Sequence, residues 1–413
     1  MADLNTIAVI GASLAGLRAV ETLRAEGFDG RLVLVGAEKH LPYDRPPLSK
    51  EILQGKWEPE QTQLKKDGYE DLDLDLRLGR RALALDPSAR SVELDDGSRV
   101  VCDGLILATG ASVKRPASLS GPDGVHYLRT LDDALAIGRG LEDAPRVAVV
   151  GAGFIGAEVA ASCRTRGLEV TLVDPLPVPM SAGLGTEMGA VCARLHRDGG
   201  VDLRMGVGVE ALCGKERVQG LRLGDGSRVD ADLVVVGVGV RPETAWLESS
   251  GIDLDDGVVC DAHCRSSIDR VFAAGDVARW YNPRYGRHMR VEHWTNAAGQ
   301  AVAAARNLLA GATGASDYQP VPTFWSDQHG VKIQFAGMAA AGDEVRVVHG
   351  STDENRFVAF YGNRGSLSAV LTFRRPRLSM LCSQWLEDGM SWDAALEKAA
   401  AELQGRKETS DVD

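Results

Sequence analysis

Short apolar runs alternate with segments of helical periodicity along the first part of the chain. The run Thr6–Ile10 is followed by the glycine-containing segment Gly11–Gly16 and by a helical pattern over Leu17–Glu26. A second apolar run, Arg31–Val35, comes next and ends near Glu38. Strand, turn, helix and strand in this order predict a βαβ unit that opens a parallel sheet.

The same order recurs in the middle of the chain. The apolar run Arg146–Val150 precedes Gly151–Gly156, a helical pattern over Ala157–Arg166, and the run Glu169–Val173, which ends at Asp174. Each unit is followed by a hairpin-like stretch and a buried strand: Val92–Ser98 and Gly104–Gly110 after the first, Gly224–Ser227 and Leu233–Gly239 after the second. An internal duplication of a nucleotide-binding unit is the simplest interpretation.

The pattern changes from about Val321, where short alternating runs are separated by turn residues. The predicted strands are Lys332–Phe335, Glu344–Val348, Phe357–Phe360 and Ala369–Phe373, and an amphipathic helix is expected near Trp392–Leu403. We expect the polar tail Lys407–Asp413 to be disordered. The predicted fold class is α/β, with two Rossmann-like dinucleotide-binding domains of the glutathione-reductase type and a C-terminal α+β domain with an antiparallel sheet. The expected boundaries are 1–115 and 242–320 for the first, discontinuous nucleotide-binding domain, 116–241 for the second, and 321–413 for the C-terminal domain.

Composition excludes several classes of protein. The 413 residues are 44% hydrophobic and 25% charged, which is typical of a globular chain and excludes a collagenous or disordered one. A net charge of -12 without a long basic tract argues against nucleic-acid binding. We expect no membrane span, because no window approaches the length that one requires. The seven cysteines show no C-x-x-C spacing and the N-terminus shows no secretory signal, so we expect a cytoplasmic protein.

The second glycine segment has every feature of a dinucleotide fingerprint. Gly151, Gly153 and Gly156 allow a sharp strand-to-helix turn, so that a pyrophosphate can lie against amides at the helix N-terminus. Asp174 follows at the distance of a ribose-binding acid. A carboxylate there repels a 2′-phosphate, and Pro175-Leu176-Pro177 offers no arginine, so NADH is favoured over NADPH.

The first fingerprint departs from the ideal, because Ser13 replaces its middle glycine and Glu38 is the only acid that can serve the ribose. A further segment supports it: Phe272–Ala278 contains Gly275-Asp276 and leads towards Asn296–Gln300 at the head of an alanine-rich helix. A carboxylate beside a helix start suits a ribityl hydroxyl, and helix amides suit the electron-rich edge of a flavin.

These segments occur together with several more specific ones. They are Pro42–Lys50 (PYDRPPLSK), Ala108-Thr109-Gly110, Ala274-Gly275-Asp276 and Phe324–Gln328 (FWSDQ). In this order the chain resembles, over nearly its whole length, the FAD- and NADH-dependent ferredoxin reductases of bacterial oxygenase systems, a group that includes the putidaredoxin, rhodocoxin and biphenyl-dioxygenase reductases.

The resemblance implies roles for individual residues. Arg45 and Lys50 would lie beside the isoalloxazine, Asp276 on the ribityl chain and Trp294 near the ring, while Glu158 would lie near the nicotinamide and pair with Lys50. The catalytic candidates are Lys50, Glu158, Trp294 and Trp325. The FAD candidates are Gly11, Ser13, Leu14, Ala15, Gly16, Glu38, Arg45, Pro46, Lys50, Ala82, Ala108, Thr109, Gly110, Arg129, Gly275, Asp276, Glu292, His293, Trp294 and Ala297. The NADH candidates are Gly151, Gly153, Phe154, Ile155, Gly156, Glu158, Asp174, Gly237, Val238 and Gly239. No metal is expected.

The absence of a cysteine pair in the segment Pro42–Glu51 bears on how electrons leave the flavin. Glutathione-reductase relatives use a cysteine pair beside the flavin, but Pro42–Glu51 contains no cysteine. Electrons would then pass directly to a [2Fe–2S] ferredoxin, whose acidic surface favours a basic docking patch. The first candidate patch is Arg284, Arg287, His288 and Arg290, and the second is Arg374, Arg375 and Arg377. Trp325 would shorten the electron path or belong to a domain-interface core.

The leading hypothesis is an NADH:ferredoxin oxidoreductase that feeds a haem monooxygenase or a Rieske dioxygenase, and that is a monomer or a weak dimer. Alternatives on the same scaffold are an NADH oxidase or rubredoxin reductase, and a non-catalytic NADH-sensing flavoprotein of the apoptosis-inducing-factor type. A quinone-reducing membrane enzyme is disfavoured by the acidic tail Glu408–Asp413.

Overall fold

The computed structural model describes residues 4–143 and 145–403 of the chain. Their contacts divide the chain into two compact units. The first contains the described residues of Met1–Arg45, Pro59–Ser112 and Val240–Pro322, and the second those of Pro46–Glu58, Val113–Gly239 and Thr323–Asp413. No helix of the described residues is long and apolar enough to cross a membrane.

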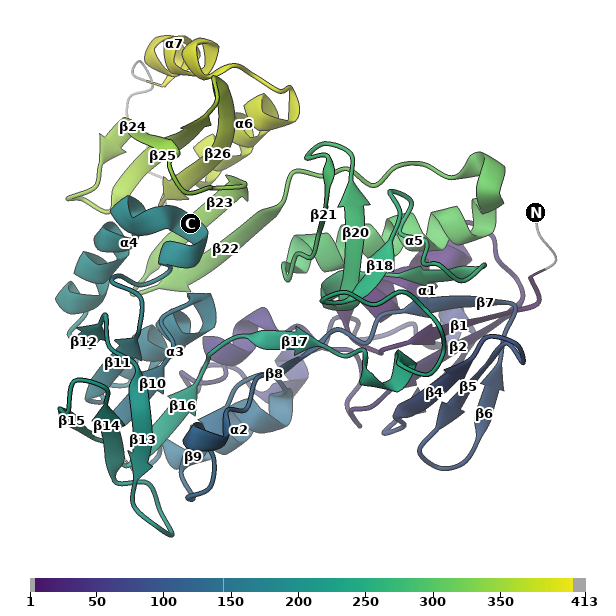
Figure 1. Ribbon diagram of the computed structural model, residues 1–413, viewed down its shortest axis with the longest axis horizontal. Coiled ribbons are helices and arrows are strands. Elements are labelled where there is room, and N and C mark those ends of the chain that lie inside the picture. Colours follow the sequence, from purple (N-terminus) through teal and green to yellow (C-terminus); the bar gives the residue numbers. More distant parts are fainter. Residues whose placement is uncertain (1–3, 144, 404–413) are drawn as a thin grey trace. The chain divides into compact units, whose positions relative to one another are not determined.

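A five-stranded parallel sheet forms the centre of the first unit (Figure 1). Its order is β19-β7-β1-β2-β3, with β1 (Thr6–Ile10), β2 (Arg31–Gly36), β3 (Leu74–Leu78), β7 (Gly104–Leu107) and β19 (Val271–Ala273). Helices α1 (Leu14–Ala25) and α5 (Trp294–Gly314) pack against each other and share a core with these strands. Burial on both faces explains the continuous apolar runs in the sequence.

Smaller elements complete the first unit. Strands β4 (Ala82–Asp86), β5 (Ser91–Leu94) and β6 (Arg99–Val101) form one antiparallel meander. A second small sheet contains β18 (Val258–Cys260), β20 (Ala278–Asn282) and β21 (Arg287–Met289), and β8 (Ala111–Val113) pairs with β17 (Val240–Pro242). The 3₁₀ turns are η2 (Pro59–Thr62), η3 (Glu70–Leu72), η5 (Ala245–Leu247) and η6 (Gly275–Val277).

The second unit repeats the parallel sheet. The order β12-β11-β10-β16-β9 is formed by β9 (Val125–Tyr127), β10 (Val147–Val150), β11 (Val170–Asp174), β12 (Asp202–Met205) and β16 (Leu233–Val236). The other elements of this part are η1 (Pro46–Ser49), η4 (Ala117–Leu119), α2 (Leu131–Gly140), α3 (Phe154–Thr165), α4 (Ser181–Asp198), β13 (Val209–Cys213), β14 (Gly220–Leu223) and β15 (Arg228–Asp230). The two parallel sheets confirm the predicted pair of Rossmann-like folds.

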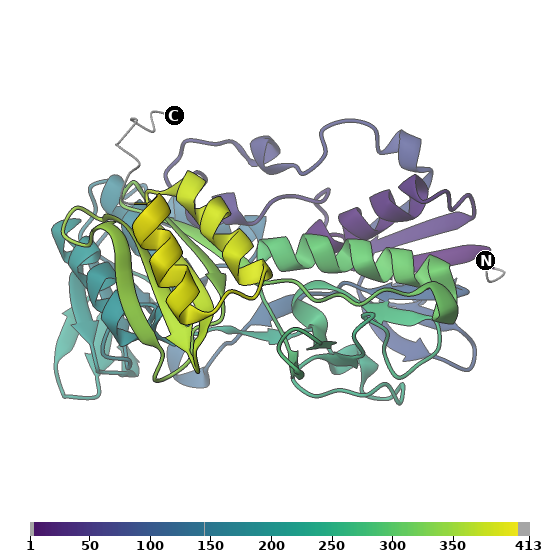
Figure 2. The ribbon, with the colours of Figure 1, turned by 90° about the horizontal axis from the view of Figure 1, so that it is seen from above.

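An antiparallel sheet follows in the second unit, in the order β22-β23-β26-β25-β24. Its strands are β22 (Thr323–Gln328), β23 (Val331–Gly337), β24 (Glu344–Ser351), β25 (Arg356–Asn363) and β26 (Ser366–Phe373). Helices α6 (Pro376–Glu387) and α7 (Trp392–Glu402) cover one face, as Figure 2 shows. Alternation along β25 explains the packing, because Phe357 joins the core shared with α4 whereas Phe360 meets Trp385 of α6.

The sequence anticipated the first two strands and the first helix of each fingerprint, helix α5 and four strands of the antiparallel sheet. Helices α2 and α4 and several strands, such as β3, β9 and β12, were not predicted. Both fingerprint helices begin three residues before the predicted starts, at Leu14 and Phe154, because the end of each glycine turn is already helical. Strand β22 and helix α6 were not predicted, while the helix near Trp392 is confirmed. The tail expected to be disordered lies outside the described residues, and the three-domain division stays a prediction.

Candidate functional site

The first fingerprint turn is closed so tightly that only glycine fits at its two ends. A Cβ atom on Gly11 would lie 2.0 Å from the carbonyl oxygen of Ala108, and one on Gly16 would lie 1.8 Å from that of Gly11. Gly11 also has a φ of +119°, which side-chain-bearing residues rarely adopt. The turn therefore delivers the chain from β1 directly into α1.

The N-terminus of α1 is open to an anion. Ser13 precedes the helix in an extended conformation and makes no side-chain capping bond, and the first turn contains no acidic residue. Amides at an uncapped N-terminus and the positive end of the helix dipole suit a phosphate group. The residues of this turn thus fit a pyrophosphate, including at the position where serine replaces glycine.

Glu38 lies beyond the end of β2 and is held by two side chains. Its carboxylate accepts hydrogen bonds from the Tyr43 hydroxyl at 2.5 Å and from the Arg45 guanidinium at 2.6 Å. Burial alone would lower the pKa of Arg45, but Tyr43, Glu38 and Asp276 together raise it above its ordinary value. Arg45 therefore lies in a group of acidic partners that includes both predicted carboxylates of this unit.

Gly275, Asp276 and the head of α5 lie beside the fingerprint helix. A Cβ on Gly275 would come within 3.3 Å of Ala15 and 3.6 Å of Ala297, and the Gly275 amide donates to Gln300 at 2.9 Å. The first unit thus joins the starts of α1, η6 and α5, which sequence reasoning assigned to one cofactor.

His293 and Trp294 begin α5. Burial lowers the pKa of His293 to about 4, against the opposing effect of Asp276, so this imidazole is neutral near pH 7. The Trp294 indole donates to the Asp44 carboxylate at 2.6 Å. Asp44 belongs to the PYDRPPLSK segment but received no predicted role, since its partner is distant in sequence.

The remaining flavin candidates of this unit have structural roles of varied kinds. Ala108 closes the fingerprint turn, and the Thr109 hydroxyl donates to the Glu243 carbonyl at 3.0 Å. Gly110 has a φ of +69°. Ala82 is buried on β4, and Glu292 is exposed and pairs with Arg290 at 2.6 Å. Pro46, Lys50 and Arg129, by contrast, belong to the second unit.

The second fingerprint turn has the same construction. Cβ atoms on Gly151 and Gly156 would lie 2.3 Å from the Gly237 carbonyl oxygen and 1.9 Å from that of Gly151. A Cβ on Gly153 would meet nothing within 4 Å, and Gly153 leaves α3 without a side-chain cap. The predicted loop Gly237–Gly239 therefore lies against the predicted fingerprint.

Asp174 ends β11 and is almost wholly buried. Its carboxylate accepts from the backbone amides of Ala152, at 2.6 Å, and Leu176, at 2.8 Å. The acid thus fixes the fingerprint turn itself, in addition to its predicted role towards a ribose. Phe154 packs on Phe324 with ring centroids 4.4 Å apart, whereas Ile155 is 48% exposed.

Lys50 and Glu158 form a buried ion pair in the second unit. The Lys50 ammonium lies 3.0 Å from the Glu158 carboxylate, and their residues are 7% and 4% exposed. Hydroxyl groups of Ser49, at 2.5 Å, and Ser326, at 2.6 Å, also donate to Glu158. A buried pair is stable only when further hydrogen bonds satisfy its charges, and the two serines provide these bonds for the Glu158 carboxylate.

This cluster joins three segments that are distant in sequence: η1, α3 and β22. The sequence predicted the Lys50–Glu158 pairing but missed both serines and the neighbouring Asp327, whose amide donates to Glu158 at 3.3 Å. Burial raises the pKa of Asp327, with Lys332 and Lys50 acting against the rise and Glu158 adding to it. Trp325 lies on β22 in the same unit, opposite Gln334 of β23.

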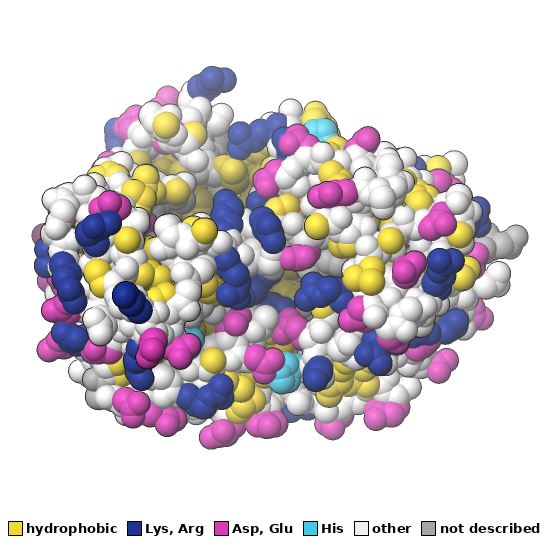
Figure 3. Space-filling view, turned by 60° about the horizontal axis from the view of Figure 1, so that its bottom comes forward, with side chains coloured by type: hydrophobic (Ala, Val, Ile, Leu, Met, Phe, Trp, Pro, Cys, Tyr) yellow, Lys and Arg dark blue, Asp and Glu magenta, His cyan; other side chains and the backbone are white. Residues whose placement is uncertain are grey.

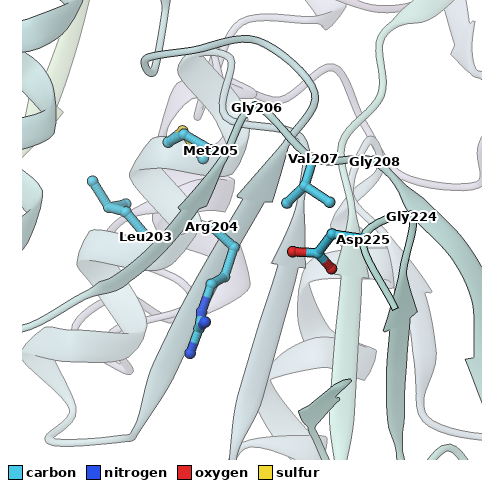
Figure 4. A pocket seen from close by; sticks show the side chains of 8 residues that line it. All are labelled: Leu203, Arg204, Met205, Gly206, Val207, Gly208, Gly224 and Asp225. Carbon is cyan, nitrogen blue, oxygen red and sulfur yellow. The ribbon is translucent and has the colours of Figure 1, made fainter. Parts of the chain in front are cut away.

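A groove of about 510 Å³ in the second unit contains none of the predicted residues. It lies between the end of β12 and the β14–β15 turn, where Asp225 is placed beside Val207 (Figure 4). The Asp225 carboxylate is already used by the amide and hydroxyl of Ser227. The groove nevertheless borders the segment of the fingerprint acid, because the amides of Val207 and Gly206 donate to the carbonyl groups of Asp174 and Leu176.

The predicted docking arginines differ in exposure. Arg284, Arg287 and His288 are exposed, but the Arg290 side chain is 11% exposed and pairs with Asp256 and Glu292. In the second cluster Arg375 is buried, whereas Arg374 and Arg377 are exposed. On the face shown in Figure 3, acidic and basic side chains are interspersed over most of the surface.

All seven cysteines are free thiols. Burial raises the pKa of Cys102 to about 11 and that of Cys163 and Cys192 to about 12, so these thiols are poor nucleophiles. None of the seven belongs to the Pro42–Glu51 segment or to either fingerprint turn. The residues present thus fit two dinucleotides without a sulfur relay.

Comparison with known proteins agrees with this geometry. The family model of the pyridine nucleotide-disulphide oxidoreductases matches residues 5–301, and that of the reductase C-terminal domain matches residues 323–404. The chain is 40% identical to the ferredoxin–NAD(+) reductase component of an anthranilate 1,2-dioxygenase system from Burkholderia cepacia, covering 88% of this chain and 89% of the relative. It is 36% identical to rhodocoxin reductase from Rhodococcus erythropolis, covering 93% and 90%.

A solved structure supports the same relationship. The reductase in the covalent putidaredoxin reductase–putidaredoxin complex matches with a TM-score of 0.89 and 31% identity, over 97% of this chain and 99% of the other. The resemblance inferred from the motifs is therefore confirmed over the whole fold. The chain belongs to the pyridine nucleotide-disulphide oxidoreductase family, and within it to the ferredoxin–NAD(+) reductases of oxygenase systems.

Proposed function

We propose that this protein uses FAD to take a hydride from NADH and passes the two electrons, one at a time, to a [2Fe–2S] ferredoxin that serves an oxygenase. The observation that most directly supports this reaction is the buried cluster of Lys50, Glu158, Ser49 and Ser326. It unites three of the family's segments around a paired charge. The overall balance is NADH plus two oxidised ferredoxins giving NAD⁺, two reduced ferredoxins and one proton.

Bound FAD would supply the chemistry of accepting two electrons together and releasing them singly. The chain's own residues would bind and orient FAD and NADH. We propose that the amides at the start of α1 hold the FAD pyrophosphate, with Glu38 on its ribose and Asp276 on its ribityl chain. The start of α3 and Asp174 would do the same for NADH. Lys50 would lie beside the isoalloxazine, and Glu158 would orient the nicotinamide.

We propose the domain division of 1–115 with 242–320 for FAD, 116–241 for NADH, and 321–413 for the C-terminal domain. Each of the first two would then contain one parallel sheet with its own fingerprint, and the third would contain the antiparallel sheet. The seven free thiols support a reducing compartment, so we also propose that the protein works in the cytoplasm.

The reaction is tested by stopped-flow reduction of the purified yellow holoenzyme. NADH should bleach the flavin, and an added [2Fe–2S] ferredoxin should be reduced with two equivalents per NADH. Glu158→Gln should retain FAD and slow bleaching by about tenfold to a hundredfold, because it removes the partner of a buried charge. Rapid bleaching with oxygen uptake, and no reduction of any ferredoxin or rubredoxin, would establish an oxidase instead.

Docking is tested separately. We propose Arg284 and Arg287, which are exposed, as part of the ferredoxin surface, and Trp325 as a residue on the electron path. Arg287→Glu should raise the KM for ferredoxin several-fold, most strongly at low salt, without changing reduction by NADH. Arg306→Glu, which alters an exposed arginine on α5, is the matched control. Equal effects of the two substitutions would count against this surface.

A further inference from the structure

Hydrogen bonds continue outward from Glu158 through the second unit. The Ser326 hydroxyl, which donates to Glu158 Oε1, accepts from Gln328 Nε2 at 2.9 Å. Gln328 Oε1 lies 3.0 Å from His196 Nε2, and His196 Nδ1 lies 3.1 Å from His329 Nε2. This series of hydrogen bonds therefore extends from Glu158, a catalytic candidate, to the turn between β22 and β23.

The chemistry of the partners fixes the direction of every bond. A glutamine carbonyl oxygen can only accept, so His196 Nε2 must hold its proton and Nδ1 must offer a lone pair. His329 Nε2 is then the donor to His196 Nδ1. All the donors in this chain consequently point towards the Glu158 carboxylate, which also accepts from Lys50 and Ser49 on its other oxygen.

Both imidazoles are neutral near pH 7. Burial lowers the pKa of His196 to about 4, with His329 adding to the effect and Gln328 opposing it. Burial and the charge of Arg164 lower the pKa of His329. Charged groups lie at both ends of this series of hydrogen bonds: Lys50 and Asp327 lie near Glu158, and Arg164 lies near His329. The arrangement thus adds donors without adding charge.

The outer end is fixed by packing as well as by bonding. His329 has a φ of +50° and Gly330 one of +71°, as the two-residue turn of this hairpin requires. Gly199, just after α4, lies so close that a Cβ there would be 2.3 Å from His329 Nδ1. His196, Ser326 and Gln328 are each no more than 1% exposed. This degree of burial leaves no water to replace a lost bond.

We propose that Gln328, His196 and His329 are positioning residues for Glu158, which hold its carboxylate aligned through Ser326. The inference rests on the proposed function, because it concerns the group assigned to orient NADH. An amide passes no proton readily, so this series of hydrogen bonds fixes the geometry of Glu158 and does not carry a proton. The β22–β23 turn thereby becomes part of the NADH site.

The test compares His329→Leu with His329→Gln in the FAD-loaded protein. A glutamine amide can still donate to His196 Nδ1, whereas leucine cannot. Histidine ¹⁵N NMR should show His196 as the Nε2–H tautomer in the wild type and in His329→Gln. In His329→Leu the ¹⁵N resonance of His196 Nδ1 should shift, because that nitrogen loses its hydrogen-bond donor while burial still keeps the ring neutral at pH 6. NAD⁺ affinity measured by calorimetry should fall about tenfold at pH 6 in His329→Leu alone, as expected for the loss of one buried hydrogen bond.

Two further variants keep the test decisive if His329→Leu folds poorly. Gly199→Ala displaces the His329 ring without removing a donor and should reproduce the leucine defect. Gln328→Glu is isosteric but cannot donate to Ser326 when ionised, so NAD⁺ affinity should fall as in His329→Leu. Unchanged resonances of His196 Nδ1 and unchanged NAD⁺ affinity in all four variants would overturn the proposal.

Failure of the proposed function has a different signature. If NADH did not bleach the wild-type flavin, or no ferredoxin were reduced, that reaction would be wrong whatever the state of His196. The NMR measurement depends on neither event. A His196 Nδ1 resonance that responds to residue 329 while NAD⁺ affinity does not would show a purely structural chain and would also overturn the positioning role.

Discussion

The two fingerprint turns offer an internal comparison, because the same construction occurs once in each unit with different residues. Both turns are tightly packed at their first and last glycines. A Cβ atom added to Gly11, Gly16, Gly151 or Gly156 would overlap a backbone carbonyl oxygen. The middle position differs: it is Ser13 in one turn and Gly153 in the other. Since a Cβ on Gly153 would meet no protein atom within 4 Å, packing demands glycine only at the two ends.

The acids that follow the turns differ in another way. Glu38 is held by the side chains of Tyr43 and Arg45, whereas Asp174 is held by the backbone amides of Ala152 and Leu176. The first acid belongs to a network of charged and phenolic groups, and the second acts as a clamp on its own turn. The acid at the same position of the repeated fold thus has different partners in the two units: side chains in the first and backbone amides of its own turn in the second.

The largest effect is expected from Gly16→Ala and Gly156→Ala. Each adds a Cβ less than 2 Å from a carbonyl oxygen and should lower the free energy of unfolding by about 3 kcal/mol or more. Gly16→Ala should also lose FAD, while Gly156→Ala should stay yellow but no longer be bleached by NADH. Gly138→Ala, on α2 with nothing within 4 Å, is the control in urea unfolding. If both Gly16→Ala and Gly156→Ala lost FAD, the expectation that each turn binds its own dinucleotide would be contradicted.

Acid should destabilise both units, since each contains a histidine held neutral. The folded-state pKa of His196 and His293 is about 4, below the ordinary 6.5, so their contribution is present above pH 6.5 and is lost as the pH falls towards 4. By pH 5 we expect a loss of about 2 kcal/mol from His196 and less from the more exposed His293. Urea unfolding at pH 7, 6 and 5 measures this. His196→Gln should reduce the slope, and an unchanged slope would refute the assignment.

Asp174→Asn and Glu38→Gln compare the two acids directly. An amide oxygen can accept one of the two amides that Asp174 serves, but its NH₂ group faces the other, so we expect NADH affinity to fall about tenfold. Glu38→Gln can still accept from Arg45 and should change FAD retention by less. Calorimetry with NAD⁺ and ultrafiltration of FAD give the two values. A larger effect at Glu38 would reverse the comparison.

The smallest effect is expected at the middle positions of the turns. Gly153→Ala should change the free energy of unfolding by less than about 0.5 kcal/mol, because its Cβ enters open space. It should raise the KM for NADH a few-fold if a pyrophosphate approaches this backbone. Ser13→Gly should leave stability and FAD content close to those of the wild type. A strongly destabilised Gly153→Ala would show that packing, too, requires this glycine.

The local parts of the site could be predicted because a strand, a glycine turn, a helix and an acid occur within one short stretch of each fingerprint. The Lys50–Glu158 pairing joins residues 108 positions apart and was expected only from the family resemblance. Ser326, Gln328 and His196 could not be assigned, because a buried serine, glutamine or histidine looks like many others in sequence. Asp44 was missed for the same reason, its Trp294 partner being distant along the chain.

The sequence by itself determined the two Rossmann-like folds, because hydrophobic period and glycine spacing dictate the strand-to-helix turns. The family and its two dinucleotides followed from the resemblance of more specific segments such as Pro42–Lys50 and Phe324–Gln328. Only the tertiary structure decided which side chains donate hydrogen bonds to Glu158, which backbone amides donate to Asp174, and which arginines remain exposed. The contacts around Glu158 depend on hydrogen bonds between segments more than a hundred residues apart, such as Ser49 to Glu158 and His196 to Gln328, whereas Asp174 accepts from amides 22 and 2 residues away. Burial makes each of these bonds costly to lose, and burial is a property of the folded chain alone.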